Sequence, residues 1–178
     1  MINKKLLIVS VIFLLLFMPI EKSYGHGLGI DTANIDINGR QISVSVEIPS
    51  SFDESQEKII TITAIDKDTN EAAKNVTFSI GLSHENQIFF RNYFFTDDGT
   101  LLIHIVPIEQ GETQIVAEKD SLLGAWYETD FQPIQLVGPV FKSGGLFNFE
   151  IELRTIDEPT NIVENLGVHN VDVSIIDT

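Results

Sequence analysis

The stretch I-S-V-S-V-E-I at residues 42–48 alternates apolar and polar side chains along its whole length. Successive side chains of a β-strand point to opposite faces of a sheet, so this alternation predicts a strand with one buried and one solvated face. The same period recurs in four further segments: residues 60–64, 76–82, 147–153 and 171–175. Shorter or more continuously apolar runs bring the expected total to about eight or nine strands: residues 88–95, 101–106, 114–118 and 134–137.

Turn residues separate these segments. Asn38-Gly39 and the Asp-Asp-Gly at residues 97–99 supply the positive φ angles that tight hairpins require. No segment has the pattern of a long amphipathic helix, and residues 155–165, which are interrupted by Pro159, are expected to form a single helical turn at most. Strands at short spacing without intervening helices predict an all-β fold, an antiparallel β-sandwich.

The first 25 residues have the pattern of an export signal. Lys4 and Lys5 precede an apolar run of 15 residues, and the small residues Ser23 and Gly25 occupy the −3 and −1 positions of a cleavage site. We therefore expect cleavage before His26, which leaves residues 26–178 as one extracellular or cell-surface domain. The alternative is an uncleaved membrane anchor, although a spanning helix needs about 20 apolar residues.

Charge and composition restrict the partners. Residues 26–178 hold 8 Lys and Arg against 25 Asp and Glu, a net charge of −17, which would repel nucleic acid and anionic lipid headgroups. Contact with a membrane is expected only through an uncleaved leader. The chain has no cysteine, which excludes disulfides, thiol catalysis and cysteine-ligated zinc.

Two blocks of the sequence resemble known proteins. The run A-I-D-K-D-T-N-E-A-A-K-N-V-T-F-S-I at residues 64–80, followed by F-F-T-D-D-G-T-L-L-I-H-I at residues 94–105, resembles bacterial and archaeal immunoglobulin-like modules. This resemblance implies an immunoglobulin-like β-sandwich and no catalytic residues. The segment G-H-G-L-G near the start, together with residues 138–168, resembles an uncharacterised group of exported proteins of ammonia-oxidising archaea. Members of that group continue further, which implies that this chain is a short form or a fragment.

His26 is the sharpest candidate for chemistry. A histidine at a mature N-terminus can bind copper through its α-amino nitrogen and Nδ1, and imidazole nitrogens suit copper well. This arrangement resembles the histidine brace of copper monooxygenase subunits and periplasmic copper carriers. The second imidazole is expected from His84, with His104 in reserve. The alternative is that His26 is an incidental terminal residue.

Other motifs are weaker. Asp66, Asp68 and Asn70 occupy the first, third and fifth positions of a calcium loop, but Glu71 replaces the required glycine, so at most weak surface calcium is expected and a solvated turn is favoured. Asn75 begins a glycosylation sequon. The phenylalanines within residues 89–95 are expected to be mainly core.

These observations predict an exported, non-enzymatic binding or structural module that needs no cofactor and whose partner is a protein or a surface polymer. The alternative is a copper-binding module built on His26 that serves as a carrier or as a subunit of a redox assembly. An enzyme acting on an external polymer ranks last, because the sequence has no G-x-S-x-G turn and no phosphate-binding glycine loop.

Overall fold

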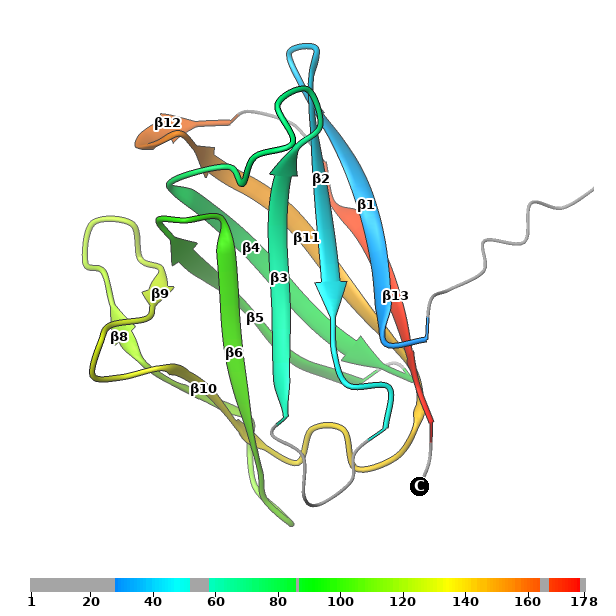
Figure 1. Cartoon of the computed structure of the whole chain (residues 1–178). Coiled ribbons are helices and arrows are strands. Elements are labelled where there is room, and N and C mark those ends of the chain that lie inside the picture. Colours follow the sequence, from blue (N-terminus) through cyan, green and yellow to red (C-terminus); the bar gives the residue numbers. More distant parts are fainter. Residues whose placement is uncertain (1–27, 52–57, 86, 164–166, 177–178) are drawn as a thin grey trace, which may run out of the picture.

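The computed structural model describes residues 28–51, 58–85, 87–163 and 167–176, and every regular element in these ranges is a β-strand (Figure 1). The all-β prediction is therefore confirmed. The predicted leader and His26 lie outside the described residues. Within the described ranges no helix is long and apolar enough to cross a membrane. The strands are β1 (Ile30–Ile37), β2 (Arg40–Glu47), β3 (Ile59–Asp66), β4 (Val76–His84), β5 (Gln87–Thr96), β6 (Thr100–Pro107), β7 (Gln114–Val116), β8 (Glu118–Lys119), β9 (Trp126–Tyr127), β10 (Ile134–Gly138), β11 (Gly145–Ile156), β12 (Glu158–Ile162) and β13 (His169–Ile175).

These strands form two sheets that face one another. The first sheet has the order β1-β2-β3-β6-β10-β7 and lies in front in Figure 1. The second has the order β12-β11-β4-β5-β9-β8, and β13 also pairs with β11. Most neighbours are antiparallel, but β10 pairs with β6 and β9 pairs with β5 in parallel, so the antiparallel prediction was wrong for these two pairs. Long connections between the paired strands allow them to run in the same direction.

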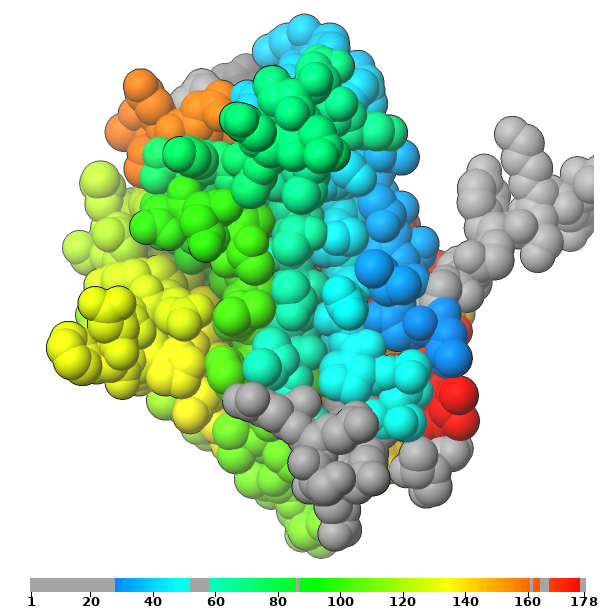
Figure 2. Space-filling model, viewed as in Figure 1, coloured from blue at the N-terminus to red at the C-terminus, as the bar shows by residue number. Residues whose placement is uncertain are grey.

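The core lies between the sheets and is built from the apolar positions of the alternating segments. Val44 and Ile62 of the first sheet, and Phe78 and Phe149 of the second, are completely buried. Apolar burial contributes about 25 cal/mol per Å² removed from water, which explains how a chain without disulfides can be stable. The surface of the first sheet is continuous across β1, β2, β3 and β6 (Figure 2).

One edge of the first sheet is joined to the second sheet. The Gly29 amide donates to the Ser174 carbonyl oxygen at 3.1 Å, and the Asp172 amide donates to Asp31 Oδ2 at 3.1 Å. The Ile176 amide donates to the Ser50 carbonyl oxygen at 2.8 Å. As a result β1 and β13 lie side by side, as Figure 1 shows.

The two predicted hairpin turns differ in outcome. Asn38 and Gly39, with φ angles of 54° and 90°, form a two-residue hairpin between antiparallel β1 and β2, as predicted. The turn at residues 97–99 instead connects β5 of the second sheet to β6 of the first, so the hairpin prediction there was wrong. Asp98 Oδ1 accepts from the Thr100 amide at 2.8 Å and stabilises this crossing turn.

All nine predicted strands are present, but four others were missed: β1, β8, β9 and β12. The predicted helical turn is wrong, because residues 158–162 form β12, which pairs with β11. Pro159 is tolerated there since β12 is an edge strand, where a missing amide donor costs no ladder hydrogen bond.

Candidate binding groove

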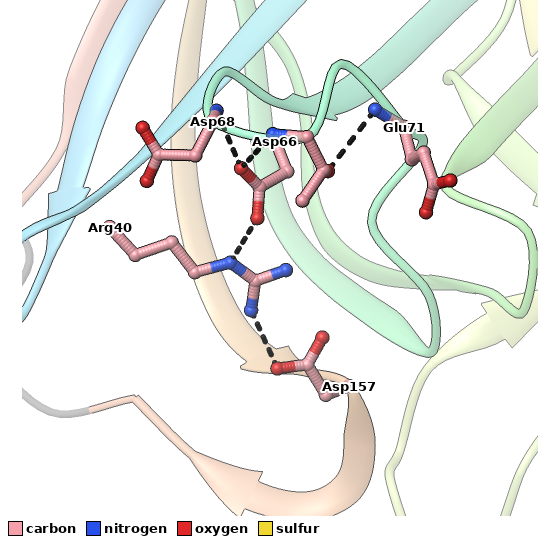
Figure 3. A network of polar contacts seen from close by, with 6 residues as sticks. Arg40, Asp66, Asp68, Glu71 and Asp157 are labelled. Carbon is pink, nitrogen blue, oxygen red and sulfur yellow. Dashed lines mark hydrogen bonds and ion pairs between the residues drawn. The ribbon is translucent and has the colours of Figure 1, made fainter.

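A polar cluster joins the two sheets at one end of the molecule (Figure 3). Arg40 at the start of β2 donates from Nε to Asp66 Oδ2 at 2.5 Å and from Nη1 to Asp157 Oδ2 at 2.6 Å. Asp66 ends β3, whereas Asp157 lies in the turn between β11 and β12 of the second sheet. Arg40 therefore links the sheets through two carboxylates, and we call these three residues the arginine clasp.

The arginine clasp uses both oxygens of Asp66. Its Oδ1 accepts from the backbone amides of Asp68 at 2.8 Å and Thr69 at 3.3 Å, while Oδ2 faces Arg40. The hydrogen bond from Arg40, together with these amides, holds the pKa of the Asp66 carboxyl below its usual value. The hydrogen bonds that Arg40 donates to Asp157 and, second, to Asp66 raise the pKa of Arg40.

The hydrogen bonds of Asp66 give the turn at residues 66–71 a structural role. The carboxylates of Asp68 and Glu71 point away from Asp66 in Figure 3, and Asn70 sits at a positive φ of 59° as a turn residue. In the described part of the chain no group of three or more histidine, aspartate and glutamate side chains is arranged to hold a metal ion. Of the three residues in the calcium-loop pattern, Asp66 belongs to the clasp, while the Asp68 amide and Asn70 belong to the turn.

The structure separates the two described histidines of the predicted copper site. His84 ends β4 of the second sheet; its ring stacks on Phe147 at 4.3 Å between centroids, and its Nδ1 lies 2.9 Å from the Leu146 carbonyl oxygen. His104 lies on β6 of the first sheet, between buried Ile103 and Ile105, and so projects from the outer face. Their partner in the prediction, His26, is not among the described residues.

Asn75, the predicted glycosylation residue, is engaged in the fold. Its Nδ2 donates to the Asp157 carbonyl oxygen at 2.7 Å, and its φ is 51°. Val76 and Thr77, the rest of the sequon, are both buried. Asn75 therefore supports the same turn that carries Asp157 in the arginine clasp.

A groove of about 430 Å³ lies on the outer face of the second sheet. Its floor consists of Thr77, Tyr93, Arg154 and Thr155, from β4, β5 and β11. The Thr155 hydroxyl donates to that of Thr77 at 2.7 Å. The Arg154 guanidinium carbon lies 5.9 Å from the Tyr93 ring centroid.

Two chain segments form the walls of this groove. One is the loop between β8 and β9, which contributes Leu122 and Leu123; the other is β12, which contributes Pro159, Thr160 and Ile162. Both segments lie on the left side of the molecule in Figure 1. Leu122 is 84% exposed and Ile162 is 66% exposed, so the groove presents apolar side chains to solvent.

Hydrogen bonds fix the conformation of the loop at residues 120–124, which we call the leucine turn. Asp120 Oδ1 accepts from the backbone amides of Leu122 at 2.8 Å and Leu123 at 2.7 Å. The Asp120 amide donates to the Ala125 carbonyl oxygen, and the Gly124 amide donates back to the Asp120 carbonyl oxygen, both at 2.9 Å. Asp120 and Gly124, at a φ of 64°, thus make an ordered turn that displays two leucines.

The strands beside this turn are tied together by side chains. The Tyr127 hydroxyl of β9 donates to Glu118 Oε2 of β8 at 2.9 Å, and this hydrogen bond raises the pKa of Tyr127. The Lys119 ammonium lies 4.9 Å from the Trp126 ring centroid. Two strands of only two residues each are thereby held in register under the leucine turn.

None of the groove residues was predicted from the sequence. Of the aromatic group at residues 89–95, Phe90 and Phe94 are buried as predicted, while Tyr93 is 43% exposed in the groove. The walls come from short strands with weak patterns. A usable signal was present in D-S-L-L-G at residues 120–124, where two leucines stand inside a sequence typical of a turn. Comparison with protein-family models, with curated proteins and with solved structures finds no match to this chain.

Proposed function

We propose that the chain is an exported, non-enzymatic binding module with an immunoglobulin-like β-sandwich, and that the groove between the leucine turn and β12 binds its partner. The observation that carries this proposal is Leu122, which is 84% exposed on a turn fixed by Asp120. Exposed apolar side chains on an ordered scaffold are typical of binding sites, because little conformational freedom is lost when the partner binds.

The chemistry of the groove supports binding over catalysis. Its lining, all of it within the described residues, contains no carboxylate or imidazole that could transfer a proton at neutral pH. Thr77 and Thr155 hydrogen bond to one another, and Arg154 pairs with Glu152 at 2.9 Å. Each of these three side chains already has a partner within the protein, and most of the remaining lining is apolar, so apolar contact is the main interaction that we expect for a ligand.

Site-specific photo-crosslinking tests this proposal. A photoreactive amino acid is placed at position 122 in one variant, at position 162 in a second, and at position 88 in a control variant of the full chain expressed in an exporting host. Ile88 is 67% exposed and lies outside the groove lining, so it matches the exposure of the test positions. We expect one discrete adduct from positions 122 and 162 and none from position 88. Equal labelling at all three positions, or none, contradicts the proposal.

Copper binding through His26 is the second candidate, and the geometry of His84 favours it. A carbonyl oxygen only accepts, so His84 Nδ1 carries the proton donated to Leu146, and the lone pair of the ring is on Nε2. Metal-binding histidines commonly use one nitrogen in this way and bind the metal with the other.

N-terminal sequencing of the exported protein followed by copper titration tests this second candidate. A mature His26 terminus and one tightly bound copper, lost in both His26→Ala and His84→Ala, are expected. His104→Ala is the matched control and should retain the copper. A retained leader, or copper binding that neither variant changes, contradicts it.

A further inference from the structure

We infer that the occupant of the groove is a basic peptide segment, in which one or two large apolar residues are flanked by lysine or arginine. This inference rests on the proposed function and names the chemistry of the partner. It follows from three properties of the groove: its apolar walls, the internal pairing of its floor residues, and the exposed carboxylates that neighbour the wall segments in sequence.

The walls select an apolar anchor. Leu122 and Ile162 line the groove from different wall segments, and Tyr93, which also lines it, is 43% exposed. A groove of about 430 Å³ has room for one or two side chains of the size of leucine or phenylalanine. Such anchors contribute most of the binding energy in protein interfaces.

The floor selects against an acidic or strongly polar anchor. Arg154 is the cation in the groove lining. It forms an ion pair with Glu152 at 2.9 Å and a cation–π contact with the Tyr93 ring. A carboxylate on the ligand would have to displace Glu152 to reach this guanidinium. The Thr155 hydroxyl donates to that of Thr77, and both side chains are buried. A ligand therefore gains little from polar groups directed at the floor.

The carboxylates next to the wall segments favour a cationic partner. Glu118 and Glu128 are exposed and lie on either side of the leucine turn in sequence, and exposed Glu158 immediately precedes Pro159 of β12. The whole chain carries a net charge of −15, so its long-range field also attracts cations. Lysines or arginines on each side of an apolar anchor would meet these carboxylates. Charge complementarity of this kind raises association rates and excludes partners of the wrong sign.

Fluorescence anisotropy with defined peptides tests the inference. The first probe is a fluorescein-labelled synthetic peptide with one phenylalanine and one leucine set among four lysines. In a second peptide glutamates replace the lysines, and in a third serines replace the phenylalanine and leucine. We expect the first peptide to bind the intact protein at 0.15 M salt and the other two to bind at least about tenfold more weakly.

Variants locate the binding. The double substitution Leu122→Ser with Ile162→Ser should weaken binding of the first peptide by about tenfold or more, whereas Ile88→Ser should leave it unchanged. Each changed side chain is exposed, so the variants should fold, and their thermal unfolding verifies this. Glu158→Gln should weaken binding and reduce its salt dependence.

Several outcomes overturn the inference: no binding of the first peptide, equal affinity for the glutamate peptide, or equal affinity of the double variant. A neutral hexasaccharide that binds in the groove would also overturn it and would assign the groove to a polymer of sugars. If position 122 still gives a discrete crosslink while the lysine peptide fails, the groove is a binding site for another chemistry. If both experiments fail, the proposed function fails with the inference.

Discussion

At the scale of single residues, Asp66 shows how one carboxylate can fix a sheet-to-sheet connection. It accepts two backbone amides of its own turn and pairs with Arg40, which also reaches Asp157 of the opposite sheet. The sequence pattern around Asp66 suggested a calcium loop, because calcium loops and hydrogen-bonded turns use the same side chains. The structural role of Asp66 depends on Arg40, which lies 26 residues away in sequence, and sequence spacing alone does not reveal that the two residues meet.

The lowered pKa of Asp66 predicts an acid sensitivity. A carboxyl whose pKa is lower in the folded state contributes stability above its unfolded pKa, near 4, and this contribution is lost as the pH falls through the folded pKa. Urea unfolding of the wild type between pH 5 and pH 3 should therefore show a falling midpoint. In Asp66→Asn the midpoint should be lower at pH 5 and fall less steeply. Asp68→Asn, which removes a carboxylate outside the clasp, is the control and should behave as wild type.

Gly99 provides a second prediction at this scale. It adopts a φ of 82°, and a Cβ there would overlap the Ala73 carbonyl oxygen. Gly39 has a similar φ of 90° but open space around it. Gly39→Ala should cost about 1–2 kcal/mol from backbone strain alone, and Gly99→Ala should cost at least about 1 kcal/mol more. Chemical denaturation of both variants measures the difference; equal losses would contradict the steric account.

At the scale of elements, β11 is the longest strand and is paired along both edges. β4 covers one edge, while β13 and β12 share the other. By contrast β7, with three residues, lies at the edge of the first sheet and pairs only with β10. Local opening of an edge strand breaks few contacts, whereas exposing β4 or β11 requires the second sheet to separate.

Native-state hydrogen exchange should reflect this difference. We expect the β4 amides of residues 78–82 to exchange only through global unfolding, and those of β7 to exchange roughly a thousandfold faster or more. Mass spectrometry or NMR at several denaturant concentrations provides the measurement. Protection of β7 as high as that of β4 would show that another segment covers this edge.

The positions of the strands could be predicted from the sequence more fully than the pairing of strands into sheets. Alternation identified five strands, because burial on one face imposes a period of two on the sequence, and short apolar runs between turn residues identified four more. It did not identify which sheet each strand joins, since the Asp-Asp-Gly at residues 97–99 has the same turn chemistry in a hairpin and in a crossing between sheets. The two-residue strands β8 and β9 are too short to show any period. The groove could not be predicted as a unit, because one wall comes from the loop between β8 and β9 and the other from an edge strand that contains Pro159.

At the scale of the whole molecule, the negative charge should oppose folding at low ionic strength. With a net charge of −15, mutual repulsion of carboxylates favours the expanded chain, and salt screens it. Raising NaCl from about 0.02 M to about 0.5 M should increase the melting temperature by roughly 2–5 °C. KCl should act equally, since screening does not depend on the cation. A melting temperature that falls with salt would mean that attractive pairs such as the arginine clasp outweigh the repulsion.

The junction of β1 with β13 also determines how the molecule can be attached. Leu28 bridges to Ser174 beside the Gly145 end of β11, whereas β12 and the groove lie near Ile156 at its other end, about 35 Å away for a strand of this length. A tether or a neighbouring module joined at residue 28 or at residue 176 would therefore sit at the same pole, opposite the groove. Attachment at either point would leave the groove on the far end of the two sheets, about one β11 length from the attachment.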